Sequence, residues 1–296
     1  MPGHLILIWD YDAAIGQVNS TYPYNFHEDR IFEEIANVET ILELGREFEI
    51  RMTFACTGFT AEPGQFPYHA PDQIRKIHSL GHEIASHSWR HEWLPYLEPK
   101  QVQETLARSK YILESCLGIP GAVKGFVPPF SRPMSWYRKG AWSLGDRAFG
   151  PKHPGSNLGS LLRLVHEAGY SWCRVAYRSL WKKMRAKPLT DAYLKTWEQR
   201  HGVMCVPEDG VGFTEWAHLL SKKAIEEKKP TVITAHPSGI NRNGVEAVAK
   251  LRHLLRTIAD YQQKGVIESS TVSQYVGLSN ESFSKRETGR VMQTSG

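Results

Sequence analysis

Two histidines and two carboxylates carry the clearest chemistry in the sequence. His87 and His91 lie four residues apart in the segment GHEIASHSWRHEW, residues 81–93. On a helical turn, side chains at this spacing share one face, and two neutral imidazoles so placed can bind one metal ion at about 2.0–2.1 Å. A third ligand should come from elsewhere, and Asp10 and Asp12, which follow an apolar run, are the best donors. Two carboxylates beside two histidines favour metal-assisted hydrolysis, because they supply both metal ligands and a base.

Each of these residues also has a structural explanation. A His-x-x-x-His pair arises easily by chance in a chain with 13 histidines. Asp10 could cap the turn that follows it, and His236, which precedes a proline, could simply end a strand. The chemical interpretation therefore depends on whether the chain brings these side chains together.

The bulk composition is that of a globular protein. A chain of 296 residues can form one large domain with a sizeable core. The net charge of +5 is a mild excess, which does not argue for a nucleic-acid partner. It is compatible with an anionic substrate or a glycolipid at a membrane surface, although a solvated basic surface explains it better.

The N-terminus and the cysteines favour a cytoplasmic protein. The segment MPGHLILIWDYD lacks the basic start and long apolar core of a signal peptide. No stretch reaches the roughly 18 apolar residues of a membrane span. The four cysteines are far apart and form no C-x-x-C pair, which is typical of reduced, buried thiols.

Apolar runs and helical periods alternate along the chain, which predicts an α/β fold with a parallel sheet or barrel. We expect strands at 4–9, 50–56, 83–86, 122–127, 170–176, 202–207, 230–235 and 266–268, and helices at 31–44, 71–80, 99–117, 158–168, 216–227 and 245–263. Residues 10–16 are expected to form a loop, residues 182–200 an insertion or surface helix, and residues 279–296 a flexible tail after a single domain, 1–278. Asp10, Asp12, His87 and His236 all follow predicted strands, and sites in barrels form at the carboxyl ends of strands.

Ordered motifs resemble one known family, the NodB-like polysaccharide deacetylases (carbohydrate esterase family 4). The resemblance covers roughly residues 5–276. The segment GHEIASHSWRH is the most specific signal, because it is very close to the family's metal-binding motif. The others, in chain order, are WDYD (9–12), RMTFACTGF (51–59), GFVPPF (125–130), EAGYSW (167–172) and TAHPSG (234–239).

The resemblance implies a distorted, seven-stranded (β/α) barrel of the NodB homology type. It also implies a hydrolase that removes an N-acetyl group from a sugar or glycan. Asp12, His87 and His91 would bind zinc or another divalent metal, and a metal-bound water would attack the amide carbonyl. Asp10 would be the base and His236 the acid, while Ser88 would fix the histidine loop by hydrogen bonding.

The sequence departs from the family at two positions. Val127 replaces an arginine that orients the catalytic aspartate in the family, and Cys173 stands near the usual place of a second aspartate. Arg132 or Arg174 could substitute for the missing arginine. These departures leave open a catalytically impaired relative that binds glycans, and related folds also include amidohydrolases of small non-sugar amides.

Aromatic residues in the loops after strands indicate a sugar substrate, because flat rings suit the apolar faces of sugars. The predicted substrate contacts are Tyr11, Trp89, Pro129 and Phe130. For any single ring, burial in the core is the simpler explanation. We expect no nucleic-acid partner and no membrane span.

Overall fold

The apolar run at the N-terminus forms the central strand, β1 (Gly3–Tyr11), in which every residue except His4 is buried. The computed structural model describes residues 2–20, 28–129, 158–175, 197–213, 215–240 and 244–277. β1 pairs in parallel with β2 (Thr53–Cys56) on one side and β9 (Pro230–Ala235) on the other. A strand covered on both faces reads as a continuous apolar run, as this one does.

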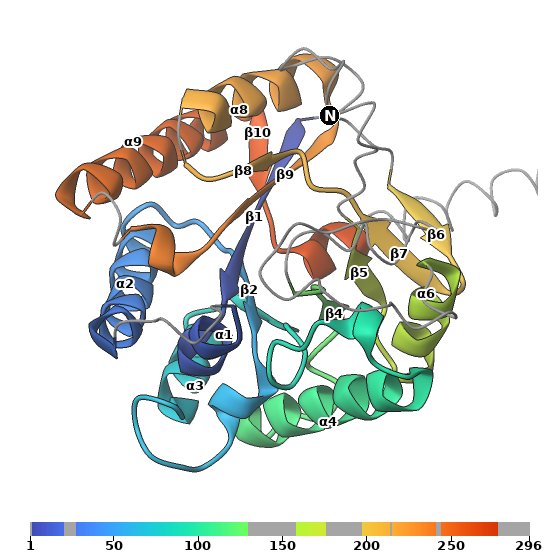
Figure 1. Cartoon of the computed structure of the whole chain (residues 1–296). Coiled ribbons are helices and arrows are strands. Elements are labelled where there is room, and N and C mark those ends of the chain that lie inside the picture. The colour runs from blue at the N-terminus through green and yellow to red at the C-terminus, as the bar shows by residue number, and fades with distance from the viewer. Residues whose placement is uncertain are drawn as a thin grey trace, which may run out of the picture.

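The sheet has ten strands in the described part of the chain, not the seven expected. Nine follow the order β6-β7-β5-β4-β3-β2-β1-β9-β8, and β10 pairs with the first residues of β1. The remaining strands are β3 (Glu83–Ser86), β4 (Gly125–Phe126), β5 (Trp172–Arg174), β6 (Glu198–Arg200), β7 (Val203–Val206), β8 (Gly210–Val211) and β10 (Ile267–Ser269). The sheet curls into a half-barrel with helices outside it (Figure 1).

The strands β6 and β8, which lie at the two edges of the sheet, were not predicted from the sequence. They have three and two residues, too few to show an alternating pattern. β6 is exposed throughout and runs antiparallel to β7, so the end of the segment 182–200, expected as an insertion or helix, is a strand instead. Residues 182–196 and the predicted tail lie outside the described residues.

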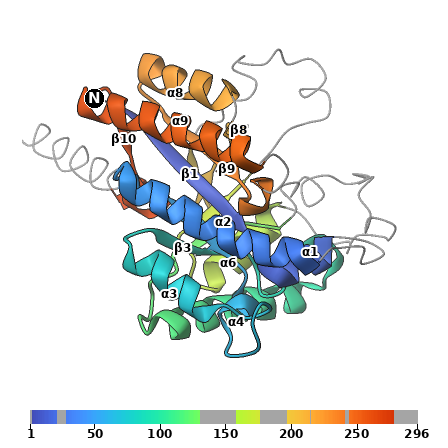
Figure 2. The ribbon, with the colours of Figure 1, turned by 90° about the vertical axis from the view of Figure 1, so that its left-hand side faces the viewer.

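The predicted helices are present and pack outside the sheet. In Figure 2, α9, α2 and α3 lie on the side that faces the viewer, and α8 lies above them. They are α2 (Glu28–Glu47), α3 (Pro71–Ser79), α4 (Pro99–Leu117), α6 (Leu158–Glu167), α8 (Glu215–Glu227) and α9 (Gly244–Gln263). The bounds of α4 follow from local chemistry: Glu98 and Gln101 form a capping box, and Gly118 ends the helix at a φ of 69°. No described helix is both long and apolar enough to cross a membrane.

Residues 10–16 differ from the predicted loop. β1 continues to Tyr11, and a helix, α1 (Ala13–Ser20), begins after one intervening residue. Ala13 makes this turn with a left-handed φ of 51°, and the Gly16 amide donates to the Asp12 carbonyl at 2.9 Å. Asp12 is therefore fixed between a strand and a helix, which restricts its side chain more than a loop would.

The pleat of the strands decides which side chains enter the half-barrel. Along β1, Leu5, Leu7, Trp9 and Tyr11 pack under the outer helices, whereas Ile6 and Ile8 line the interior. A helical turn, residues 272–277, fills the interior at the end where the strands begin. Its Val272 and Val276 pack on Ile6 and Ile8 and their neighbours. The interior positions near the carboxyl ends of the strands then remain for polar groups.

Candidate active site

Every predicted catalytic or metal-binding residue lies at the carboxyl edge of the sheet. Asp10 stands two residues after the interior-facing Ile8, and His87 stands two residues after the interior-facing Ala85. Because side chains alternate with a period of two, these polar groups continue the inward-facing rows. The expected convergence at this edge is confirmed for the described residues.

The loop after β3 brings the two histidines together, and it is not the helical turn that their spacing allowed. Ser88 and His91 have left-handed φ angles of 64° and 58°. The Ser88 hydroxyl accepts the backbone N–H of Glu92 at 3.2 Å, so Ser88 does fix this loop. The two reversals turn both imidazoles toward Asp12, with ring centroids 4.9 Å apart.

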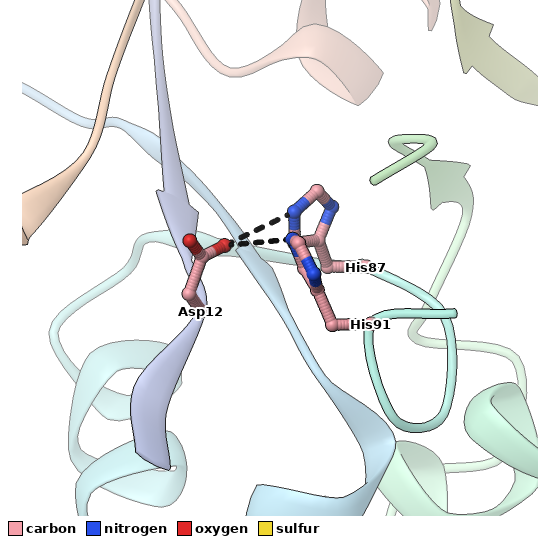
Figure 3. A group of neighbouring side chains, drawn as sticks. All are labelled: Asp12, His87 and His91. Carbon is pink, nitrogen blue, oxygen red and sulfur yellow. Dashed lines mark ion pairs between the residues drawn. The ribbon is translucent and has the colours of Figure 1, made fainter. Parts of the chain in front are cut away.

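Asp12, His87 and His91 form a compact cluster, the metal triad (Figure 3). Asp12 Oδ1 lies 3.2 Å from His87 Nε2 and 3.3 Å from His91 Nε2. One ligand atom from each residue falls within 4.8 Å of the others, and all three residues are buried. A single divalent ion bound at about 2.0–2.2 Å would fit between such atoms after small adjustments.

The tautomer of His87 supports a cation at this point. Its Nδ1–H donates to the Val127 carbonyl at 2.7 Å, which leaves the Nε2 lone pair directed at Asp12 when the ring is neutral. Neither His87 Nε2 nor Asp12 Oδ1 has a hydrogen-bond partner among the described residues. Two buried acceptors facing each other are unfavourable without a shared cation or proton, so the residues fit a metal.

The same proximity shifts the pKa values of the triad. Burial lowers the pKa of His87, but the carboxylates of Asp12 and Asp10 outweigh it and raise the pKa above its ordinary value. Burial raises the pKa of Asp12, but His91 and His87 hold it well below its usual range. The triad therefore attracts positive charge, whether a proton or a metal ion.

Gly16 lets α1 approach the triad closely. A Cβ at this position would lie 2.5 Å from Asp12 Cβ and 3.5 Å from His91 Cδ2. Real side chains do not approach so closely, so any larger residue would displace Asp12 or the helix. No feature of the sequence indicated that Gly16 would meet this requirement.

Arg174 holds the proposed base, Asp10. Its Nη1 and Nη2 donate to Asp10 Oδ1 and Oδ2, each at 2.7 Å, and both side chains are buried. Such a bidentate pair fixes the carboxylate plane as well as its position. Burial raises the pKa of Asp10, but Arg174, His87 and His236 outweigh it, so the pKa is lowered and the group is ionised at neutral pH.

Arg174, one of the two substitutes considered for the arginine missing at Val127, therefore holds Asp10. Phe126 of β4 pairs with Cys173 of β5, so Val127 and Arg174 follow at the same level of neighbouring strands. The arginine has moved one strand along the sheet, and its long side chain still reaches Asp10. Arg132, the other substitute considered, lies outside the described residues.

Glu208, which was not predicted from the sequence, supplies a carboxylate near Arg174 although none is present at Cys173. Its Oε2 lies 3.8 Å from Arg174 Nε and accepts the Thr234 hydroxyl at 3.1 Å. It stands two residues after the interior-facing Val206, just beyond a predicted strand. That position relative to the strand was a usable signal. We call Asp10, Arg174 and Glu208 the carboxylate clamp.

His236 lies beside the clamp. Its Nε2 is 3.7 Å from Asp10 Oδ2, and the side chain is 35% exposed, so it can meet both Asp10 and solvent. The 3-10 turn that follows, Pro237–Gly239, is attached to α2, because Asn37 Nδ2 donates to the Pro237 carbonyl at 3.1 Å. The outer helix α2 thus positions the loop that follows His236.

A second overlooked carboxylate, Glu34, lies on α2 behind Asp12. It is fully buried and accepts the Gln17 side-chain amide at 3.0 Å, while its Oε1 has no hydrogen-bond partner among the described residues. Burial, together with the negative charge of Asp12, raises the pKa of Glu34 to about 8. Its signal in the sequence was a carboxylate on the helix's apolar stripe, three residues after Ile31 and four before Val38.

The predicted substrate contacts lie in different environments. Tyr11 is fully buried under the helices and donates to Gln73 Oε1 at 2.5 Å, so its ring is turned away from the half-barrel interior. The centre of the Trp89 ring lies 3.5 Å from the guanidinium carbon of Arg108 and 3.8 Å from that of Arg90. Pro129 is buried beyond β4, and Phe130 lies outside the described residues. Substrate contacts by these residues stay predictions, and the ring of Tyr11 is poorly placed for one.

Comparisons with known proteins agree with the motifs. The sequence model of the polysaccharide deacetylase family matches residues 31–148, and no curated protein matches. A structure from Mycobacterium smegmatis, assigned as a polysaccharide deacetylase, is 18% identical with a TM-score of 0.60 and covers 92% of this chain and 88% of its own. The PuuE allantoinase is 15% identical with a TM-score of 0.58, covering 92% and 88%.

At these identities the two structures show a shared fold and nothing about substrate. The matched segment contains the histidine loop, and the described part of that segment also includes β2, β3 and β4. The motifs in order, the family match over residues 31–148 and the shared fold together confirm the predicted resemblance to the NodB-like polysaccharide deacetylases.

Proposed function

We propose that this chain is a metal-dependent hydrolase that removes an N-acetyl group from a sugar or glycan. The observation that carries the proposal is the adjacency of a buried Asp-His-His triad and an independently held carboxylate, Asp10. Hydrolysis of an amide needs an activated water, a base and an acid for the departing amine. The carboxyl edge of the sheet offers residues for each of these.

Asp12, His87 and His91 would hold the divalent metal, and two imidazoles with one carboxylate suit zinc. When bound, the metal supplies a Lewis acid that polarises the acetamido carbonyl and lowers the pKa of a water molecule. The Val127 carbonyl keeps His87 in the tautomer that presents Nε2.

Asp10 accepts the proton of the attacking water. Its lowered pKa keeps it ionised, and Arg174 stops the carboxylate from rotating. His236, near Asp10 and partly open to solvent, donates a proton to the departing amine. Each acid–base role typically contributes about 10²–10⁴ in rate.

A catalytically impaired relative that only binds glycans is the weaker candidate. Its main support was the missing arginine at Val127, and Arg174 now meets that objection by holding Asp10 in two hydrogen bonds. A binding protein would have no need for a buried ionised base opposite a histidine. Hydrolysis of a small non-sugar amide uses the same groups, so substrate assays must separate it from sugar deacetylation.

The test combines metal content with acetate release. The protein is purified without added metal, its bound metals are measured, and N-acetylated sugars, nucleotide sugars, chito-oligosaccharides and small amides are assayed with and without chelator. We expect one metal per chain and acetate release that chelation stops and added zinc restores. Acetate release that persists in Asp10→Asn and His91→Ala would contradict the mechanism, and turnover of a small amide alone would replace the substrate class.

A further inference from the structure

Arg90 lies in the loop that carries both histidine ligands, directly before His91. Its side chain is exposed, while its backbone carbonyl accepts the side-chain amide of Asn19 from α1. The loop around it is fixed by the Ser88 hydroxyl and by the 2.8 Å hydrogen bond from the Phe59 amide to the Trp89 carbonyl. Its main chain is therefore held at the rim of the proposed active site.

Aromatic rings also hold the guanidinium of Arg90. Its central carbon lies 3.8 Å from the Trp89 ring centre and 5.1 Å from the Phe59 ring centre. Arg108 lies 3.5 Å from the same Trp89 ring. Two guanidinium carbons this close to one ring centre would overlap if they shared a face, so they occupy opposite faces. The Trp89 ring, packed between the two guanidinium groups, thus orients Arg90.

The two arginines differ in their charge partners. Arg108 pairs with Glu62 at 3.3 Å, and Glu62 also accepts the Trp89 indole N–H at 2.9 Å. No ion pair involves Arg90 in the described part of the chain. A guanidinium stacked through its face keeps the N–H groups at its edge available, and this geometry matches carboxylate and phosphate oxygens.

We propose that Arg90 binds an oxyanion, a carboxylate or a phosphate, carried by the saccharide whose N-acetyl group reaches the metal triad. This inference rests on the proposed function and narrows its substrate class to acidic N-acetylated sugars. The stacked rings lower the entropy lost on binding, because the guanidinium is already oriented.

The experiment compares three sugars: N-acetylglucosamine, its 1-phosphate and N-acetylmuramic acid, which carries a carboxylate. Binding to the metal-loaded protein is measured by calorimetry, and acetate release is measured in parallel. We expect the wild type to bind at least one acidic sugar about tenfold or more tightly than the neutral sugar. Arg90→Gln should reduce that preference by about 10- to 100-fold, and Arg90→Lys should retain part of it.

Arg46→Gln is the matched control. Arg46 is exposed in the last turn of α2, at the opposite end of the sheet, so its loss should leave the preference unchanged. The inference is overturned if the wild type shows no preference, if the preference survives Arg90→Gln, or if that variant weakens all three sugars equally. Binding is read without turnover, so a failure of acetate release would refute the proposed function separately.

Discussion

The metal triad and the carboxylate clamp lie side by side but are built in different ways. Two of the three triad residues come from one five-residue loop, whose left-handed turns aim both imidazoles at Asp12. The clamp draws on the ends of β1 and β5 and the segment after β7. Its arginine lies one strand away from where the family motif places it. The arrangement of the two histidines thus depends on a short local geometry, whereas a long arginine can reach the same carboxylate from a neighbouring strand.

The strongest test of the triad is His91→Ala. With one imidazole lost, we expect stoichiometric metal binding to disappear and acetate release to fall by more than the roughly 10²–10⁴ typical of one acid–base group. Metal analysis after dialysis and an acetate assay measure both effects. His253→Ala, on the exposed outer side of α9, is the control and should keep full metal content. If His91→Ala still binds one metal ion per chain, His91 is not a metal ligand.

The clamp is tested by Arg174→Met, which leaves the buried Asp10 charge without its partner. We expect a loss of about 3–5 kcal/mol in the free energy of unfolding and an activity loss of about 10²-fold or more, while metal content is kept. Urea unfolding, metal analysis and acetate release measure these separately. The double variant Val127→Arg, Arg174→Val returns the arginine to the family position and should recover part of the activity. Full activity in Arg174→Met would show that Asp10 needs no clamp.

Gly16→Ala probes how tightly α1 must approach the triad. The new Cβ would overlap Asp12, so we expect about 1–3 kcal/mol of destabilisation from overpacking and a metal affinity lower by about 10–100-fold. Competition with a chelator measures the affinity. Gly277→Ala, where a Cβ meets nothing within 4 Å, should leave the affinity unchanged. An unaltered affinity in Gly16→Ala would mean that α1 can move away without cost.

Glu34→Gln only replaces one carboxyl oxygen with an amide nitrogen. Its effect is measured as the pH dependence of the free energy of unfolding in the presence of chelator. The pKa of Glu34 is about 8 in the folded chain and ordinarily 4.5, so the unfolded chain releases this proton first as pH rises. The contribution of Glu34 to stability therefore falls between those two pH values. We expect the free energy of unfolding of Glu34→Gln to rise, relative to that of the wild type, by up to about 1.4 kcal/mol per pH unit across this range. A difference in urea unfolding that stays constant from pH 5 to 8 would contradict the raised pKa.

Much of the fold was determined by local patterns. The continuous apolar run of β1, the helical periods of α2 and α9, and the Pro99 and Gly118 boundaries of α4 all predicted the elements that form. The rule that polar residues after strands meet at one edge also brought Asp10, Asp12, His87 and His236 together. The sequence did not predict the short edge strands β6 and β8, because two or three residues show no periodic pattern. It also did not predict the start of α1, because Ala13 turns the chain with an unusual, left-handed φ.

What the sequence by itself determined was the set of groups: a D-x-D pair, a histidine loop and a histidine before proline, each recognisable because its residues are close in the chain. The partners of Asp10 were decided only in the tertiary structure. Val127 and Arg174 are far apart in sequence, and strand register alone places them at one level of the sheet. The same is true of Glu208 and of the Trp89 ring held between Arg90 and Arg108. Which side chain reaches a given point depends on strand order and side-chain length, and neither is written in any one segment.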